Sequence, residues 1–283
     1  MKTNFIINLF IALTVMLLMP INYVLAEQIT IETVINSEVI NPDSKKGILR
    51  LEVKVKNKGD ETAYSVFPAI LSRDKDYILS NPVNLDPNKE FIWQEDLDIK
   101  SLGVNLEGTY HLPLLISYQD ANGYPFSTPR IHQFNVGQNT LSRIAIKAAS
   151  FVISGNQKKQ ASLTLLNLDE TTKEITLKVL HAKEIISHLE SDKLKLPANA
   201  QIEIQFDFQN FKVLPLTNSL AFFIAEYEYK NKHYSEMSPC FLSVEAKEPL
   251  KNWFTNSWLF FSGLVIIILI YITYASRKRS KDG

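Results

Sequence analysis

The sequence predicts an all-β fold of two tandem antiparallel β-sandwiches, followed by one C-terminal transmembrane α-helix. Three observations lead to this prediction. From residue 27 onward, short β-rich runs alternate with turn residues roughly every eight to twelve positions, the strand spacing of a sandwich. Landmarks of the first half recur about 110 residues later. An uncharged stretch near the C-terminus is long enough to cross a bilayer.

Residues 1–26 have the layout of a secretory signal peptide. Lys2 precedes the apolar run FIINLFIALTVMLLM, Pro20 follows it, and Val24 and Ala26 occupy the positions that signal peptidase reads. We therefore expect cleavage after Ala26. The apolar run is short for a membrane span, so an uncleaved anchor is the less favoured alternative.

The region 27–137 is predicted to form the first sandwich. In LRLEVKV, residues 49–55, Leu and Val alternate with charged residues, which directs one set into a core and the other into solvent. The predicted strands cover residues 28–35, 47–57, 62–71, 77–83, 90–99, 109–119 and 126–136. Strands of this kind and number form two facing antiparallel sheets.

The region 138–246 is predicted to repeat this plan. Landmarks near strand edges and turns recur at offsets of 109 or 110: Asn57 and Asn167, residues 60–62 and 169–171, Pro87 and Pro197, Tyr118 and Tyr227, Asn122 and Asn231, Pro129 and Pro239. The shared offset indicates a tandem duplication of one sandwich.

The C-terminal part is predicted to be a linker at 247–256, a transmembrane helix at 257–275 and a basic cytoplasmic tail at 276–283. The helix would be about 28 Å long, which matches the hydrocarbon thickness of a bilayer. Trp and Tyr flank it, and the basic RKRSK run follows it. Because basic residues stay in the cytoplasm, the region before the helix is expected to be periplasmic or extracellular at the cell membrane.

The stretch LEVKVKNKGDETAYSVFPAIL, residues 51–71, resembles the immunoglobulin-like modules of bacterial and archaeal surface proteins of the CARDB and NEW3 kind. The resemblance covers the first module, and reaches the second through the internal repeat. It implies two tandem immunoglobulin-like sandwiches outside the cytoplasm, with a binding or spacer role and no reaction.

The acidic run within that stretch has two interpretations. Asp60 and Glu61 are hard oxygen ligands of the kind that calcium takes. A full site needs more oxygens than this run supplies, whereas Asn57 and Gly59 suit a chain reversal because both tolerate positive φ. The second copy lacks the glycine and is one residue shorter. We favour a turn, and keep Asp60 and Glu61 as calcium candidates.

A second possible metal site is His181, Glu184 and His188 in HAKEIISHLE. On a helix these side chains would share one face and could bind zinc. The repeat, however, places the segment at a strand edge and crossover, and it lacks an H-E-x-x-H motif. We favour a short connection there.

The remaining histidines and the lone cysteine are predicted to be structural. His111, His132 and His233 are isolated on predicted strands or a turn, and we expect each to be a partly exposed β residue. Cys240 follows a proline in an apolar run, so we expect a small buried residue and not a reactive thiol.

No motif for a reaction or for cofactor binding is found. The sequence lacks a G-x-S-x-G elbow, a P-loop and a G-x-G-x-x-G fingerprint, and the exported region has no basic footprint for nucleic acid. We therefore expect a non-enzymatic protein without cofactor or metal, which holds a protein or glycan partner at the envelope. An accessory subunit of an envelope transport or polymer-export complex is the alternative.

Overall fold

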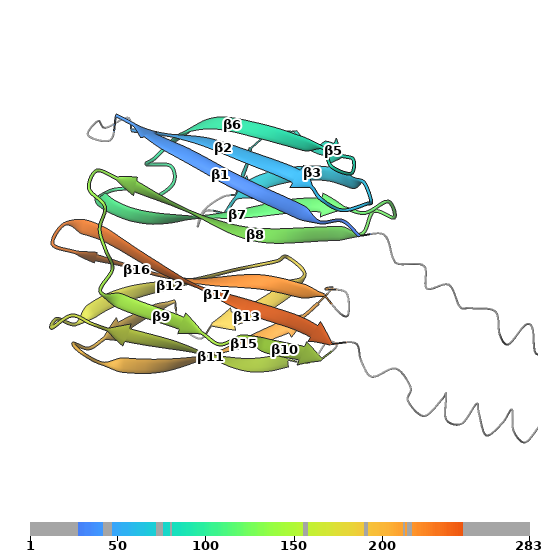
Figure 1. Ribbon diagram of the computed structural model, residues 1–283. Helices are drawn as coiled ribbons and strands as arrows, with labels where there is room; N and C mark the ends of the chain where they lie inside the picture. Colours follow the sequence, from blue (N-terminus) through green and yellow to red (C-terminus); the bar gives the residue numbers. More distant parts are fainter. Residues whose placement is uncertain are drawn as a thin grey trace, which may run out of the picture.

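The computed structural model describes residues 28–41, 47–71, 76–79, 81–154, 158–189, 192–211, 213 and 217–245. This part of the chain is all-β and forms two units that lie one above the other in Figure 1. The predicted signal peptide, linker, transmembrane helix and tail lie outside these ranges. Across the ranges given, no helix has the length and apolar character needed to cross a membrane.

The first unit consists of two facing sheets. Its strands are β1 (Ile31–Ile40), β2 (Ile48–Asn57), β3 (Ala63–Ile70), β4 (Tyr77–Ile78), β5 (Val83–Leu85), β6 (Glu90–Asp98), β7 (Glu107–Gln119) and β8 (Pro125–Val136). One sheet has the order β1-β2-β6, and the other places β7 between β8 and β3. All pairs within the unit are antiparallel, as predicted.

The core of the first unit follows the alternation in its sequence. Leu49, Leu51, Val53 and Val55 on β2 are completely buried, and the intervening residues face solvent or are half-buried. The opposite sheet contributes alternate residues of β7, including Leu114. Period-two patterning therefore set the register of this sheet, because a one-residue shift would have exposed the apolar set.

The strand predicted at 77–83 is instead two short strands. β4 pairs with the end of β3 and β5 with its beginning. Between them, Leu79 is buried in the core and its amide binds the Pro68 carbonyl at 3.1 Å. Pro82 has no amide hydrogen with which to continue a ladder, so the pairing is interrupted there.

The second unit repeats this arrangement with additional strands. Its strands are β9 (Ile144–Ala148), β10 (Phe151–Ser154), β11 (Lys158–Asn167), β12 (Lys173–His181), β13 (Ile185–Leu189), β14 (Lys193–Leu196), β15 (Gln201–Asn210), β16 (Asn218–Tyr229) and β17 (Lys232–Glu245). One sheet is β13-β15-β11-β9, and the other contains β14, β12, β16 and β17, with β10 on β17. A separate core fills the space between them.

The repeated asparagine has the same role in both units. Asn57 is fully buried, and its Nδ2 donates to the carbonyls of Glu61 and Leu85 at 2.7 and 2.9 Å. Asn167 donates in the same way to the carbonyls of Thr171 and Leu196, at 2.9 and 3.2 Å. Each asparagine thus ties the end of one strand to two other segments of its unit.

The two units are joined by a short parallel pairing of β7 with β17. Glu107 lies opposite Lys232 and Gly108 opposite His233, which merges one sheet of each unit into a ten-stranded sheet. Gly108 has φ of 147°, and a Cβ placed there would lie 2.0 Å from the His233 carbonyl oxygen. Only glycine permits this close approach of the two backbones.

The facing sheets of the two units bury side chains that belong to neither core. Leu115 and Ile224 are each 1% exposed there. His111 Nδ1 lies 2.7 Å from Ser235 Oγ, and the ring of His233 stacks on Tyr110 with centroids 3.9 Å apart. The expectation that His111 and His233 are partly exposed was therefore wrong, because each is covered by the other unit.

Replacing Gly108 is expected to loosen the junction between the units. In Gly108→Ala, the new methyl group would meet the His233 carbonyl, and the backbone would carry about 1–3 kcal/mol of strain. Spin labels at exposed positions 94 and 205 of the full chain in detergent micelles would report this as a broader distance distribution.

The matched control for the junction is Gly123→Ala. Gly123 also has positive φ, at 76°, but its Cβ would have no neighbour within 4 Å. This variant should keep the wild-type distance distribution. An unchanged distribution in Gly108→Ala would contradict the proposed role of the glycine.

Removing either buried asparagine is expected to destabilise its unit. Asn57→Ala and Asn167→Ala each leave buried carbonyls without donors, at a cost of about 2–4 kcal/mol in the free energy of unfolding. Denaturant unfolding measures the loss, and Asn105→Ala, which removes an exposed amide, is the control. Wild-type midpoints for both buried-site variants would refute the shared role.

Candidate binding surfaces

A groove with a volume of about 600 Å³ runs between the two units. Its walls come from the N-terminal segment, the β7–β8 hairpin, the turn after β12 and the beginning of β16: they include Gln28, Glu61, Tyr118, Asp120, Phe126, Arg130, Glu184 and Ser219. The beginning of β1 and the end of β17 lie at the same end of the molecule (Figure 1), and Gln28 lines the groove. The groove is therefore close to the point where the chain enters the first unit.

Arg130 contributes a mostly buried cation to this groove. Its guanidinium donates to the carbonyls of Pro129 and Ile31, at 2.9 and 3.2 Å. Burial lowers the pKa of Arg130, but an arginine stays charged at any pH relevant to a cell. With five N–H groups, the guanidinium can hold these carbonyls and still donate to a ligand.

Glu184 contributes a buried carboxyl group from the second unit. Its side chain is in a residue that is 7% exposed, and Ser127 Oγ of the first unit donates to it at 2.7 Å. The Lys183 amide in turn donates to Ser127 Oγ at 2.7 Å. Burial raises the pKa of Glu184. The contact both fixes the two units to each other and places a polar group in the groove.

Aromatic rings form one rim of the groove at the tip of the β7–β8 hairpin. Tyr118 stacks on Phe126 with centroids 5.4 Å apart, and Tyr124 is tilted against Phe126 at 5.1 Å. Flat aromatic surface beside convergent polar groups suits a polar polymer or an extended chain, because it combines contact area with directional hydrogen bonds.

The sequence contained a signal for Arg130 that its prediction did not use. In FSTPRIHQFNV, alternation puts Arg130 and His132 on the same face as Phe134, which packs into the first core. His132 is half-buried, as predicted, and its Nε2 lies 2.7 Å from Ser37 Oγ on β1. Polar residues at positions of an edge strand where the alternation predicts apolar ones could have indicated that a polar site lies beside β8.

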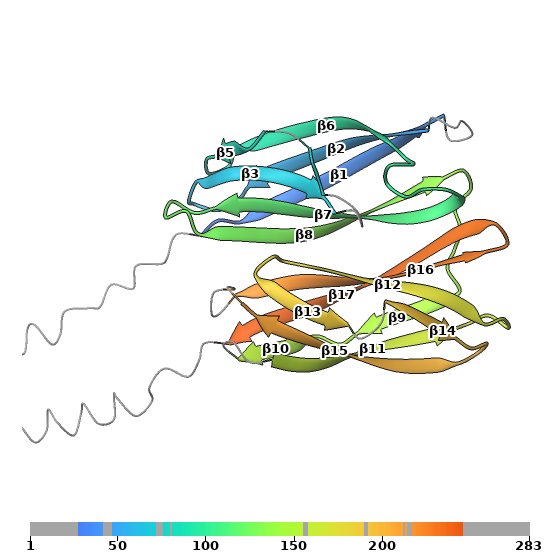
Figure 2. The same ribbon diagram turned by 180° about the vertical axis from the view of Figure 1, so that it is seen from behind.

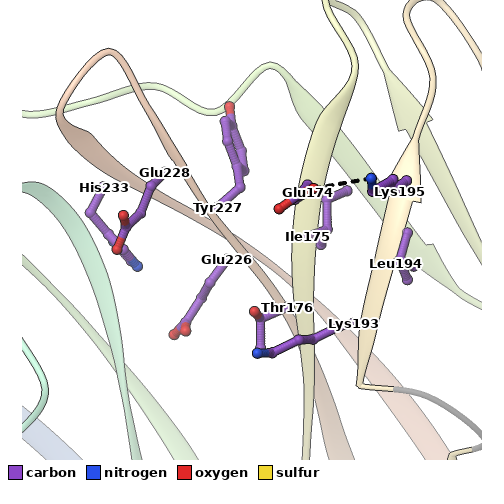
Figure 3. A pocket seen from close by; sticks show the side chains of 10 residues that line it. All are labelled: Glu174, Ile175, Thr176, Lys193, Leu194, Lys195, Glu226, Tyr227, Glu228 and His233. Atoms are coloured by element: carbon purple, nitrogen blue, oxygen red, sulfur yellow. Dashed lines mark ion pairs between the residues drawn. The ribbon is translucent and has the colours of Figure 1, made fainter.

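A second, more open groove of about 670 Å³ lies beside the edge strand β14 (Figure 3). Its charged residues include Glu174 and Lys195, which form an ion pair at 3.4 Å, and Glu226, which pairs with Lys178 at 2.6 Å. Figure 3 shows Glu228 and His233 on its far side. Because the Glu174–Lys195 pair is mostly exposed, it contributes little stability, and this surface is a weaker candidate than the groove between the units.

The acidic run at Asp60 and Glu61 connects β2 to β3, as the turn interpretation predicted. Asp60 Oδ1 accepts the Gln28 amide at 2.6 Å, and Glu61 Oε1 accepts the Ala121 amide at 3.1 Å. A Cβ on Gly59 would lie 1.9 Å from the Gln28 carbonyl oxygen. The run therefore fixes the first described residues against the turn. Its calcium binding stays a prediction.

The second acidic run has a different partner. Asp169 Oδ2 pairs with Lys173 Nζ at 2.8 Å, and this buried ammonium lies 3.1 Å from the centroid of the Tyr229 ring. The hydrogen bond from Lys173 lowers the pKa of Asp169. The two copies thus share the asparagine at the turn, but use their aspartates for separate contacts.

The residues of the possible zinc site lie on a strand edge and a turn. His181 ends β12 and its Nε2 lies 2.9 Å from Ser187 Oγ, Glu184 binds Ser127, and His188 is exposed on β13. The segment is not helical, but the expected short connection is limited to the turn at residues 182–184, because residues 185–189 form β13. In the ranges that the structure describes, no group of three or more His, Cys, Asp or Glu residues could hold a metal ion.

Cys240 is buried in the core of the second unit, as predicted. Its Sγ donates to the Ala149 carbonyl at 3.1 Å. Burial raises the pKa of the thiol to about 11, so little thiolate is present near neutral pH.

No family model and no curated protein matches the chain. Solved structures resemble it at low identity. They include the E. coli chaperone DraB, with 11% identity over 37% of this chain and 56% of that chain and a TM-score of 0.30. The putative ApaA protein from Bordetella pertussis has 14% identity over 39% and 94%, with a TM-score of 0.29.

A protein of unknown function from Porphyromonas gingivalis W83 has 8% identity over 75% of this chain and 99% of that chain, with a TM-score of 0.31. The chain spans just over half the length of DraB. At these scores the similarities assign neither a family nor a function.

The junction histidines make the contact between the units sensitive to acid. Burial lowers the pKa of His111 from 6.5 to about 4, although the negative charge of Glu226 acts to raise it. Burial also lowers the pKa of His233, whose Nδ1 lies 2.8 Å from the Thr109 carbonyl. Both rings are therefore neutral in the folded protein near pH 7.

Acidification is expected to destabilise the folded chain. The unfolded state binds a proton at His111 near pH 6.5, whereas the folded state binds it only near pH 4. The contribution of neutral His111 to stability is therefore complete above pH 6.5 and is lost as the pH falls from 6.5 to about 4. The loss is on the order of 2–3 kcal/mol. Denaturant unfolding at several pH values measures it. His111→Gln should reduce the slope in this window, and a slope equal to that of the wild type would contradict the assignment.

Proposed function

We propose that the protein is a membrane-anchored, non-enzymatic binding or scaffold protein that holds a protein or polysaccharide partner at the cell envelope. The predicted signal peptide and transmembrane helix support a single-pass protein with residues 27–246 outside the cytoplasm. The histidines with lowered pKa values are engaged in structural contacts, such as His111 with Ser235, which supports a role without catalysis.

The strand order supports the immunoglobulin-like interpretation of both units. β1-β2-β6 facing β8-β7-β3 corresponds to the A-B-E and G-F-C strands of that fold. In the first unit, Tyr110 Oη donates to the Leu106 carbonyl at 2.8 Å, as does the tyrosine at the start of strand F in many such domains. This agreement supports an immunoglobulin-like fold, which is also what the resemblance to CARDB and NEW3 modules implies.

The observation that carries the proposal is the groove between the units. Its opposing walls are connected through Ser127 and Glu184, and the merged sheet holds the units together. A binding surface fixed before the ligand arrives loses less conformational entropy on binding. The cation of Arg130, the carboxyl group of Glu184 and the aromatic rim supply hydrogen bonds and contact area within one space.

Filling the groove is expected to abolish partner binding. Ser219→Trp adds a bulky ring inside the groove, and Ser162→Trp makes the same change on the outer sheet of the second unit. A photo-crosslinker at Thr217 of the full chain in cells should give a defined adduct with an envelope protein or glycan. We expect Ser219→Trp to reduce its yield at least tenfold and Ser162→Trp to leave it unchanged; equal yields would sink the proposal.

A further inference from the structure

The two units differ at one sheet edge. In the second unit, β15 lies between β11 and β13, and its residues 206–210 pair antiparallel with β13. In the first unit, β6 pairs with β2 along its whole length. Among the residues that the structure describes, no strand pairs with its other edge. Figure 2 shows β13 beside β15 and β6 at the top of the first unit.

The internal repeat establishes which part of β6 corresponds to the covered part of β15. The amides of Asn57 and Asn167 bind the carbonyls of Lys89 and Ala200, the residues directly before β6 and β15. Asn88 and Asn199 just before these both have positive φ. This offset of 111 aligns residues 95–99 of the first unit with the residues that β13 covers.

The uncovered edge has features that favour an added strand. Its outward N–H and C=O groups up to the Asp98 amide have no ladder partner in the described residues, whereas β13 satisfies those of β15. The Asp98 carbonyl accepts the Ser101 amide and Oγ at 3.0 and 2.6 Å, so the open edge ends there. Phe91 and Ile92 on β6 are 41% and 43% exposed, and Leu97 is only half-buried against the first core. A strand laid along this edge would cover apolar surface and complete the backbone ladder.

The charge of β6 determines which strand can bind. It carries Glu90, Glu95, Asp96 and Asp98 and no basic residue. Glu90 pairs with Lys54 and Asp96 with Arg50, but Glu95 and Asp98 make no ion pair in the described part of the chain. On the segment that corresponds to the covered part of β15, Asp98 thus lies without an ion pair on the same face as Asp96, and Glu95 lies on the opposite face.

The same acids oppose pairing of β6 with β6 of a second copy, because like charges would face each other across the ladder. In the second unit, β13 places His188 opposite Asp207, the counterpart of Asp96. A basic side chain is therefore the natural neighbour at this position, and repulsion of acidic strands adds specificity.

We propose that the open edge of β6 at residues 95–98 accepts an extended strand from a partner protein, antiparallel to β6. The strand alternates apolar residues, beside Leu97, with Lys or Arg, opposite Asp96 and Asp98. This inference rests on the proposed binding function and identifies a protein, and not a glycan, as the partner at this second surface.

The experiment uses the full chain in detergent micelles and a fluorescent peptide of six residues that alternates Val and Lys. A peptide of the same composition with its Val and Lys residues in separate blocks tests the pattern, and one that alternates Val and Glu tests the charge. We expect at least tenfold tighter binding of the Val-Lys peptide, with increased hydrogen-exchange protection of the Asp96 and Asp98 amides, which point away from β2.

Charge reversal provides the matched variants. Asp98→Lys should weaken binding of the Val-Lys peptide at least tenfold and strengthen binding of the Val-Glu peptide. Glu203→Lys makes the same kind of change on exposed β15 and should have no effect. Because these side chains are on the surface, the variants are expected to fold, which circular dichroism can confirm.

Three results would overturn the inference. They are equal binding of the patterned and block peptides, absent protection of β6, or unchanged affinity in the charge-reversed variant. If the chain instead forms dimers with increasing concentration, and hydrogen exchange of the β6 amides slows in these dimers, the occupant of the edge is a second copy of the chain. If the peptide fails but the Thr217 adduct forms and responds to Ser219→Trp, the edge hypothesis falls and the proposed function stands. If the peptide binds as expected but the Thr217 adduct does not form, the groove is not the binding surface and the edge hypothesis stands.

Discussion

The close approach of two backbones at Gly108 and His233 is the constraint on which the arrangement of the units depends. His233 is held at this point from several sides: its Nδ1 lies 2.8 Å from the Thr109 carbonyl, and its own carbonyl accepts Thr140 Oγ1 at 2.7 Å. Tyr110 covers its ring. Because the two paired strands belong to different units, their sheets become continuous and their faces must stack.

A second contact at the other end of the hairpin prevents rotation about this junction. Ser127 lies near the start of β8, about ten residues along the hairpin from the Gly108 end, or about 30 Å by the strand rise. It bonds both Glu184 and the Lys183 amide. With one attachment at each end, the facing sheets stay in register, and the groove beside Ser127 keeps a defined width.

Local patterning was enough to predict most of the strands, because burial on one face of a sheet requires period-two alternation. It could not predict how the units meet. The contact of His111 with Ser235 spans 124 residues, and the isolated histidines gave no indication of their partners. Nothing in the sequence near Gly108 indicates that a second backbone passes within contact distance. The sequence predicted that Asn57 lies at a turn, but it gave the wrong physical reason for an asparagine there. Asn57 has no positive φ, and its side chain acts instead through buried hydrogen bonds.

The two copies of the repeat differ in the strands that form their sheet edges. In the second unit, β10 runs parallel to β17 on one side and β13 covers β15 on the other. In the described part of the first unit, β1 and β8 meet through side chains, Ser37 with His132 and Arg130 with the Ile31 carbonyl, and β6 has an open edge. Unpaired backbone N–H and C=O groups cost free energy when they are buried, and when exposed at a sheet edge they can pair with a strand of another chain. In the second unit the short strands β13 and β14, of five and four residues, form sheet edges, whereas β6 presents an edge of nine residues. Because short edge strands offer few backbone groups, strand addition is expected to favour the first unit.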